Sequence, residues 1–201
     1  MEKTRIAVLV SGGGTNLQAL IDAERAGKIP HGQIALVLSS KADVYALERA
    51  RLAGIPSVVV PRKELSGEQF EQALLSALSE ARIELCVLAG FLSILGPRVI
   101  DAYRDRIINV HPSLIPSFCG AGFYGLRVHE AALAYGVRVS GATVHLVNEI
   151  PDGGRILLQK AVEIKDGDTP EILQRRIMEK AEWKLLPRAT EMMARAIAKE
   201  K

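Results

Sequence analysis

The chain has few of the residues that build metal sites, disulfide frameworks or membrane spans. Its 201 residues include two cysteines, Cys86 and Cys119, which lie 33 positions apart and form no Cys-x-x-Cys pair. This spacing predicts neither a zinc site nor a disulfide-stabilised fold. The longest mostly apolar stretch, residues 85–95, is shorter than the ~18 residues expected of a membrane span. We therefore expect no metal and no membrane partner.

A large excess of one charge is also missing. The 26 basic and 23 acidic residues leave a net charge of +3, spread along the chain. Nucleic-acid binding needs a basic stripe, so no nucleic-acid partner is expected. The apolar run at residues 6–10 is too short for the core of a secretory signal, which favours a cytoplasmic protein.

The chain does have the length of one domain and a regular alternation of elements. Continuous apolar runs predict buried strands, and apolar stripes at helical spacing predict helices between them. The strands are expected at residues 6–10, 34–38, 57–60, 85–89 and 107–110, and the helices at residues 16–28, 44–52, 67–81 and 129–135. Such alternation is typical of an α/β fold with a parallel sheet.

The C-terminal part of the chain has a different pattern. Residues 140–147 and 155–164 read as two strands joined by seven residues, too few for a helical crossover, so this pair should be antiparallel. A helix is expected from about residue 170 to at least residue 186, with Pro187 kinking or restarting it. The prediction is a mostly parallel sheet with an antiparallel C-terminal edge and a long C-terminal helix.

Three glycines follow the first expected strand, in the segment Ser-Gly-Gly-Gly-Thr-Asn at residues 11–16. Glycine allows close approach of the backbone to an anion, and the following helix start offers free N–H groups. A dinucleotide motif would need glycine in place of Leu17, and a P-loop would need Gly-Lys at the helix start. A small phosphate site is therefore favoured, and a tight turn that binds nothing is the alternative.

Asn109 lies near the end of the fifth expected strand, and His111 directly follows that strand. Period-two alternation puts their side chains on the same side, at the sheet edge where α/β proteins bind ligands. Taken alone the pattern is weak, because a histidine there can equally be structural. His145, on a later strand, could either reach the cleft beside His111 or serve as a hydrogen-bonded strand residue.

Four motifs in order resemble the folate-dependent formyltransferases. Residues 109–116, Asn-Val-His-Pro-Ser-Leu-Ile-Pro, and the downstream Asp-Gly-Gly at 152–154 resemble the catalytic signature of that family. Residues 11–18 and 88–95 narrow the resemblance to the branch that formylates phosphoribosylglycinamide, over essentially the whole chain. The resemblance implies a Rossmann-like twisted sheet with helices on both faces. It also implies one formyltransferase domain, 1–201, with a phosphate-binding half at about 1–105 and a catalytic and folate half at about 106–201.

The activity implied by the resemblance is formyl transfer from 10-formyltetrahydrofolate to the amine of 5'-phosphoribosylglycinamide, a step of purine biosynthesis. Both partners are small molecules, no metal is needed, and the enzyme would be a monomer or a homodimer. Rival activities within the same chemistry are hydrolysis of the formyl donor and formylation of methionyl-tRNA or a sugar. A non-enzymatic rival is a phosphoribosyl sensor that uses the glycine segment without chemistry.

The resemblance also implies roles for individual residues. The catalytic residues would be Asn109, His111 and Asp152. The substrate would be bound by Gly13, Gly14, Thr15, Asn16 and Glu182. Folate would be bound by Phe91, Leu92, Ser93, Ile94, Leu95, Asn109, Asn148, Glu149, Ile150 and Pro151. The Asp152 carboxylate is expected to raise the pKa of His111 and so to favour the imidazolium form.

Some positions depart from the family pattern. Ser93 stands where relatives often carry arginine, and Gly67 falls near another position where a folate-contacting arginine is common. The loop at residues 118–125 is richer in glycine than the usual sequence and contains Cys119, which is expected to be inert rather than a nucleophile. His129 and Glu130 resemble the start of a zinc-protease motif, but Leu133 replaces its second histidine.

Overall fold

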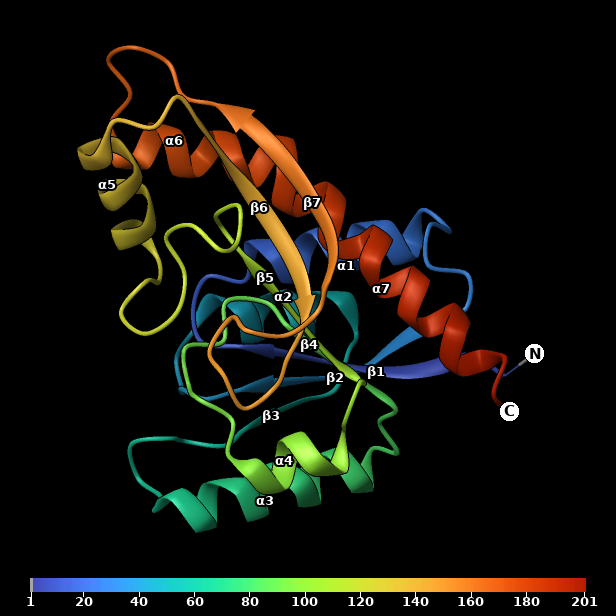
Figure 1. Cartoon of the computed structure of the whole chain (residues 1–201). Helices are drawn as coiled ribbons and strands as arrows, with labels where there is room; N and C mark the ends of the chain where they lie inside the picture. Colours follow the sequence, from blue (N-terminus) through green and yellow to red (C-terminus); the bar gives the residue numbers. More distant parts are fainter. Residues whose placement is uncertain (1) are drawn as a thin grey trace.

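In the computed structural model, which describes residues 2–201, the chain folds around a seven-stranded twisted sheet (Figure 1). The strand order is β3-β2-β1-β4-β5-β6-β7. The strands are β1 (Thr4–Val10), β2 (Gly32–Ser39), β3 (Ser57–Val59), β4 (Leu85–Leu88), β5 (Ile107–His111), β6 (Val139–Leu146) and β7 (Ile156–Glu163). The pairs among β1 to β5 are parallel, whereas β5–β6 and β6–β7 are antiparallel. The predicted fold class is confirmed, including the antiparallel edge.

Side-chain alternation along β1 sorts the helices onto the two faces of the sheet. Ile6 and Val8 belong to one buried cluster, together with residues of α1 (Thr15–Arg25), α2 (Tyr45–Ala53), α5 (Leu126–Tyr135), α6 (Pro170–Ile177) and α7 (Trp183–Ala198). Ala7 and Leu9 belong to the other, with residues of α3 (Gly67–Glu80) and α4 (Pro97–Ala102). Each fully buried Val, Leu or Ile side chain of these clusters stabilises the fold by about 1.5–3 kcal/mol. Figure 1 shows α3 and α4 on the opposite side of the sheet from α1 and α7.

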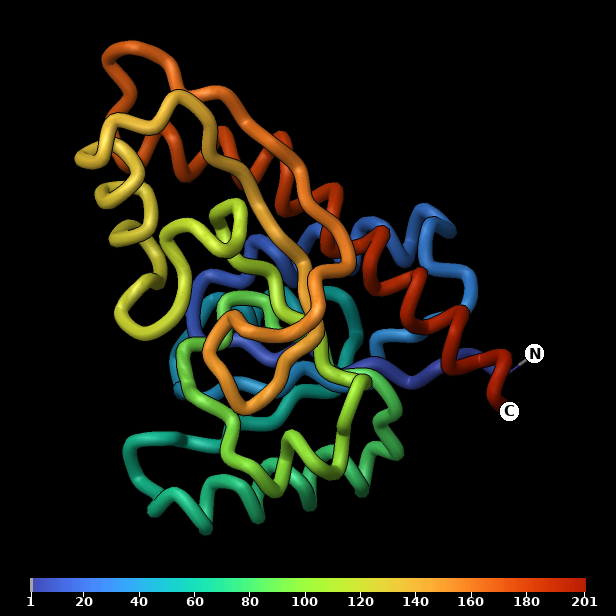
Figure 2. The backbone as a smooth tube through the Cα atoms, in the orientation of Figure 1, coloured from blue at the N-terminus to red at the C-terminus, as the bar shows by residue number. Residues whose placement is uncertain are grey.

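The antiparallel edge sets the register of the residues expected at the active site. In the β5–β6 pair Asn109 lies opposite His145, and His111 lies opposite Thr143. The long loop at residues 112–125 leaves β5 and leads to α5 (Figure 2). Polar side chains from two adjacent strands therefore share the sheet edge from which this loop starts.

The C-terminal helix is interrupted, but not where it was expected. The Thr169 side chain caps α6, which ends in a π-helical turn at Met178–Glu182 before α7 begins. Pro187 lies inside α7, so the helix does not restart at this proline as the alternative expectation had it; it restarts at Trp183. A proline ring crowds the carbonyl four residues earlier, here that of Trp183. The wider π turn ends at Glu182, the residue before Trp183. Helix α7 then continues through Pro187 without a break.

Two short helical segments differ from the sequence prediction. Helix α4 was not predicted, because six residues are too few for an apolar period to show; it begins at Pro97, a residue favoured in a first turn. Helix α5 begins at Leu126 rather than at His129. Among residues 2–201, no helix combines the length and apolar character needed to cross a membrane.

Candidate active site

Four polar side chains converge at the end of β5, and we call Asn109, His111, His145 and Asp152 the polar cluster. The Asn109 amide nitrogen lies 3.2 Å from His145 Nε2 and donates a 3.5 Å bond to Asp152 Oδ1. His111 Nδ1 lies 3.5 Å from Asp152 Oδ2, and His145 Nε2 lies 3.5 Å from Asp152 Oδ1. The expected meeting of the residues at 109, 111 and 152 is therefore observed.

Asp152 reaches the cluster from the loop between β6 and β7. Its backbone is left-handed, with φ of 56°, a conformation that Asp tolerates better than most residues. Its Oδ2 also accepts a 2.8 Å hydrogen bond from the Gly120 amide. Burial acts to raise the pKa of Asp152, but the bonds from His145 and Gly120 and the adjacent imidazoles bring it below its usual 3.8. Asp152 is therefore a carboxylate at neutral pH.

His111 is almost fully buried, and its two ring nitrogens face two different acceptors. Nε2 lies 2.8 Å from the carbonyl oxygen of Phe118, and a carbonyl can only accept, so Nε2 carries a proton. Burial lowers the pKa of His111 below 6.5, although the Asp152 charge and the Phe118 carbonyl act to raise it. The expectation of a raised pKa is therefore wrong: desolvation of the charged ring outweighs the nearby carboxylate.

His145 was not among the predicted site residues, but it is a member of the polar cluster. It is 2% exposed, and its Nδ1 donates a 2.8 Å hydrogen bond to the Leu146 carbonyl. Its Nε2 lies 3.2 Å from the Asn109 amide nitrogen and 3.5 Å from Asp152 Oδ1. Both open interpretations of this residue hold, since it is hydrogen-bonded within its strand and also reaches the cleft.

The loop at residues 112–125 folds back over the polar cluster. Phe118 has a left-handed backbone with φ of 50°, which places its carbonyl against His111 while the Gly120 amide contacts Asp152. Thr143 anchors the start of this loop, because its hydroxyl donates 2.7 Å to the Ser113 carbonyl and accepts 3.1 Å from the Ile115 amide. The loop is thus held at its base by β6 and at its tip by the cluster.

A cavity of about 150 Å³ adjoins the cluster and is lined by most of the residues expected to bind folate. Its lining includes Phe91, Ser93, Ile94, Leu95, Asn109, Asn148, Glu149, Ile150 and Pro151. Leu92 does not line it; the Leu92 side chain is 55% exposed. The cavity is also lined by Leu88, Ile100, His145, Val147 and Asp152, of which the first four were not predicted.

The glycine segment leads into α1 as expected. Gly14 is left-handed at φ of 72°, and no side chain of residues 2–201 caps the first N–H groups of the helix. The Asn16 amide donates a 2.7 Å hydrogen bond to Glu182, so two expected substrate residues meet although they are 166 positions apart. Glu182 is 6% exposed, and burial raises its pKa to about 7 against the opposing bond from Asn16. A proton or a hydrogen-bonding ligand would stabilise this carboxyl group.

Cys119 and a second cavity lie outside the polar cluster. Cys119 donates through Sγ to the Pro116 carbonyl, and burial and the Asp152 charge raise the pKa of its thiol, which does not favour a nucleophilic thiolate. A larger cavity of about 830 Å³ lies between α1 and α7, lined by residues such as Ala19 and Trp183. Within residues 2–201, no three His, Cys, Asp or Glu side chains are grouped to hold a metal ion.

Comparison with known proteins shows which family the chain belongs to. Residues 4–190 match the family model described as formyl transferase. The chain belongs to the formyl transferase family. Phosphoribosylglycinamide formyltransferase of Haemophilus influenzae is 42% identical over 184 residues, which make up 91% of this chain and 84% of that protein.

Solved and longer relatives agree with this membership. The crystal structure of glycinamide ribonucleotide transformylase 1 from Symbiobacterium toebii matches with a TM-score of 0.90 and 41% identity, covering 96% of this chain and 89% of that one. The human trifunctional purine biosynthetic protein adenosine-3 is 43% identical over 194 residues, 96% of this chain. The chain spans 14% to 18% of the length of such trifunctional relatives.

Some contacts of the site in this formyl transferase were not predicted from the sequence. Only one of them, that of His145, had a sequence pattern that could have indicated it. His145 had a signal, because it alternates with Thr143 on a strand expected to pair at the sheet edge. The contacts of the Phe118 carbonyl and the Gly120 amide had none. They are backbone groups whose placement depends on left-handed residues and on the docking of a whole loop.

Proposed function

We propose that the chain transfers a formyl group from 10-formyltetrahydrofolate to the amine of 5'-phosphoribosylglycinamide. The observation that supports this most is the convergence of an amide, two imidazoles and a carboxylate beside a cavity lined by the residues expected to bind folate. A relative named phosphoribosylglycinamide formyltransferase aligns with most of the chain, which supports phosphoribosylglycinamide as the formyl acceptor.

The polar cluster has the donors that this reaction requires. When an amine attacks a formyl carbon, negative charge develops on the formyl oxygen. The Asn109 amide and a ring N–H of His111 can both donate to that oxygen, and one such donor is worth about 3–4 kcal/mol in the transition state. No side chain has to act as a nucleophile, because the new C–N bond forms to the amine and the old C–N bond breaks at the folate nitrogen.

Proton transfer completes the balance of the reaction. The attacking amine loses one proton, and the departing folate nitrogen gains one. His111 and Asp152, with 3.5 Å between ring nitrogen and carboxylate, form a pair through which a proton can be held and passed on. Acid–base catalysis by such a group contributes about a hundredfold or more. Because His111 Nε2 donates to the Phe118 carbonyl, donation to the substrate requires this loop to release the ring.

The glycine segment and Glu182 form the proposed substrate site. The uncapped N–H groups at the start of α1 suit a phosphate, and Gly13, Gly14, Thr15 and Asn16 surround them. The buried Glu182 carboxyl, joined to Asn16, can accept hydrogen bonds from the substrate. In this proposal the chain acts as one domain, with a phosphate-binding half up to about residue 105 and a catalytic and folate half beyond it.

An assay with both substrates separates this proposal from its rivals. The purified chain is incubated with 10-formyltetrahydrofolate, with and without phosphoribosylglycinamide, and both tetrahydrofolate and formylated product are measured. Equal amounts of the two products, formed only when the amine is present, are expected. Release of formate without the amine would indicate a hydrolase, and binding of the ribonucleotide without turnover would indicate a sensor.

A further inference from the structure

Two buried hydroxyl groups join the ends of neighbouring strands at the edge of the sheet that carries the site. Ser11 follows β1 and Ser40 follows β2, and each is 3% exposed. Their Oγ atoms lie 2.6 Å apart. The Ser11 Oγ also accepts a 2.9 Å hydrogen bond from the backbone N–H of Leu92, which lies in the loop after β4.

Backbone hydrogen bonds on both sides align the end of β1, just before Ser11, with its neighbouring strands. β1 lies between β2 and β4, the Ser40 amide donates to the Val10 carbonyl at 3.1 Å, and the Ala89 amide donates to the Leu9 carbonyl at 2.9 Å. The three strand ends are therefore level with one another. A hydroxyl on the central strand can reach the loops of both neighbours, which is the arrangement observed.

This bond links two segments that the proposed function assigns to different substrates. Ser11 directly precedes the glycines of the proposed phosphate site, and Leu92 lies within the segment at residues 91–95 that adjoins the proposed folate cavity. We propose that Ser11, held by Ser40, is a positioning residue that couples the two substrate sites through the Leu92 backbone. The inference rests on the proposed function.

The sign of the coupling follows from the order of the chain. An anion bound by the N–H groups after Gly12 restrains the backbone on the C-terminal side of Ser11. This restraint limits the motion of Ser11 Oγ, which accepts the hydrogen bond from the Leu92 N–H. The segment at residues 91–95 therefore loses less conformational freedom when folate binds. Ligands that order a shared element bind with positive cooperativity.

The test measures each affinity with and without the other ligand. Tetrahydrofolate is titrated calorimetrically into the folded chain, free or saturated with phosphoribosylglycinamide. In the unmodified chain the ribonucleotide should tighten tetrahydrofolate binding about fivefold or more, within the usual range of coupling between sites. In Ser11→Ala this factor should fall to near one, and KM for the formyl donor should rise more than kcat falls.

Ser39→Ala is the matched control. Ser39 is the fully buried last residue of β2, next to Ser40, and its hydroxyl donates locally to the Lys41 carbonyl at 2.6 Å. The Ser39→Ala variant loses a buried hydroxyl but keeps the hydrogen bond between Ser11 and Leu92. Its coupling factor should therefore equal that of the unmodified chain. Ser40→Ala, which leaves the Leu92 bond but removes the partner of Ser11, should give an intermediate factor and serves if Ser11→Ala does not fold.

The outcomes separate this inference from the proposed function. If the unmodified chain binds both ligands without coupling, or if neither Ser11→Ala nor Ser40→Ala lowers the factor relative to Ser39→Ala, the coupling role is overturned while the function stands. If the unmodified chain binds neither ligand, the proposed function itself fails.

Discussion

Asp152 makes contacts through both of its carboxylate oxygens, and its charge acts on both imidazoles of the polar cluster. In Asp152→Asn the side chain keeps its size but loses the charge that raises the pKa of His111. The His111 pKa, already lowered by burial, should fall further. The imidazolium form exists below that pKa, so the decline of kcat with rising pH should move to lower pH.

The magnitude and the control of this prediction are both accessible. At neutral pH, kcat should drop about tenfold for each unit by which the pKa falls. The measurement is the pH dependence of kcat for the two proteins. Asp166→Asn is a suitable control, because Asp166 pairs with Arg138 at the surface. A pH profile that is the same with Asn at position 152 would argue against the coupling of Asp152 to His111.

His111 itself is predicted to be needed for turnover but not for ribonucleotide binding. His111→Ala should lower kcat by about a hundredfold or more, because it removes a donor and a proton carrier. The affinity for phosphoribosylglycinamide should remain near normal, since its proposed site lies at the end of β1. Steady-state kinetics and calorimetry measure the two quantities.

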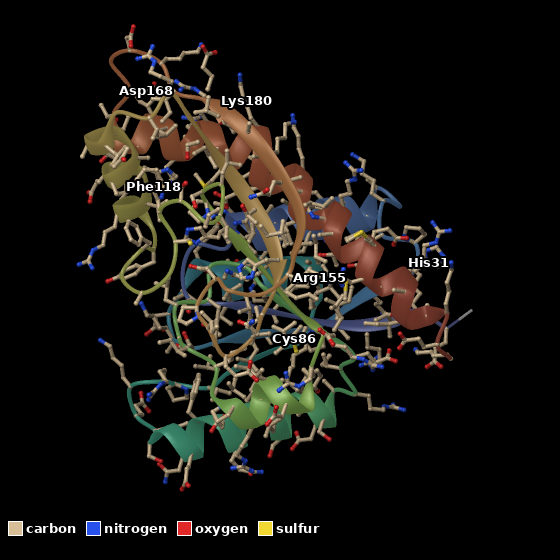
Figure 3. All side chains as sticks on the ribbon, viewed as in Figure 1. His31, Cys86, Phe118, Arg155, Asp168 and Lys180 are labelled. Carbon is tan, nitrogen blue, oxygen red and sulfur yellow. The ribbon has the colours of Figure 1, made fainter. Side chains whose placement is uncertain are left out.

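His31→Ala is the control for the loss of a histidine. His31 pairs with Glu191 at 2.6 Å and lies beside α7, on the opposite side of the molecule from Phe118 (Figure 3). This variant should keep its kcat. Near-normal turnover of His111→Ala would remove His111 from the mechanism.

At the scale of elements, the turn between β1 and α1 depends on a single glycine. A Cβ on Gly14 would lie 2.7 Å from the Ala46 Cβ, and its φ of 72° disfavours any L side chain. Gly14→Ala should therefore destabilise the fold by about 2–4 kcal/mol, from backbone strain and overpacking together. It should also weaken phosphoribosylglycinamide binding, because the start of α1 is displaced from α2.

Gly12→Ala is the matched control within the same segment. A Cβ at Gly12 would meet no atom of the described part of the chain within 4 Å, and the φ of Gly12 is not left-handed. Its unfolding temperature should stay close to that of the unmodified chain, whereas that of Gly14→Ala should fall clearly. Equal unfolding temperatures for the two variants would show that the packing against Ala46 is not a constraint.

The sequence patterns that predicted elements correctly are those set by local burial. Continuous apolar runs such as residues 6–10 must be strands covered on both faces, and the short connection between β6 and β7 allows only an antiparallel pair. The break in the C-terminal helix was misplaced, because a π turn is set by packing and leaves no residue signature. Helix α4 was missed because one and a half turns give no period.

The candidate site also has features that could be predicted from the sequence and features that could not. Alternation placed Asn109 and His111 on one side of β5, and the convergence with Asp152 was predicted from the resemblance. The burial that lowers the His111 pKa could not be predicted, because it is produced by the loop at residues 112–125 folding over the ring. Loop docking is a tertiary event, and the sequence of the strand does not contain it.

At the scale of the whole molecule, two buried groups should give stability opposite dependences on pH. His129 is fully buried, neither ring nitrogen has a hydrogen-bond partner among residues 2–201, and burial lowers its pKa from 6.5 to about 4. Glu182 is also buried, and its pKa rises from 4.5 to about 7. Each gap corresponds to about 3 kcal/mol of linked stability.

The signs follow from which state binds more protons. Between pH 4 and 6.5 the unfolded chain protonates the imidazole at position 129 more than the folded chain does, so stability is lost as pH falls. Between pH 4.5 and 7 the folded chain protonates Glu182 more than the unfolded chain does, so stability is lost as pH rises. The two contributions oppose each other over the shared interval, from pH 4.5 to 6.5.

Removing either ionisable group should therefore reveal the pH dependence of stability that the other group causes. Relative to the unmodified chain, Glu182→Gln should lose up to about 3 kcal/mol of stability between pH 6.5 and 4.5, and His129→Leu should gain a similar amount over the same interval. Urea unfolding at fixed pH, followed through the single tryptophan, Trp183, measures both slopes. Comparing slopes with the unmodified chain removes the contributions of carboxylates common to all three proteins. If the three slopes coincide, protonation of these two groups is not linked to folding, and the burial of uncompensated charge at positions 129 and 182 must be relieved by water entering the fold.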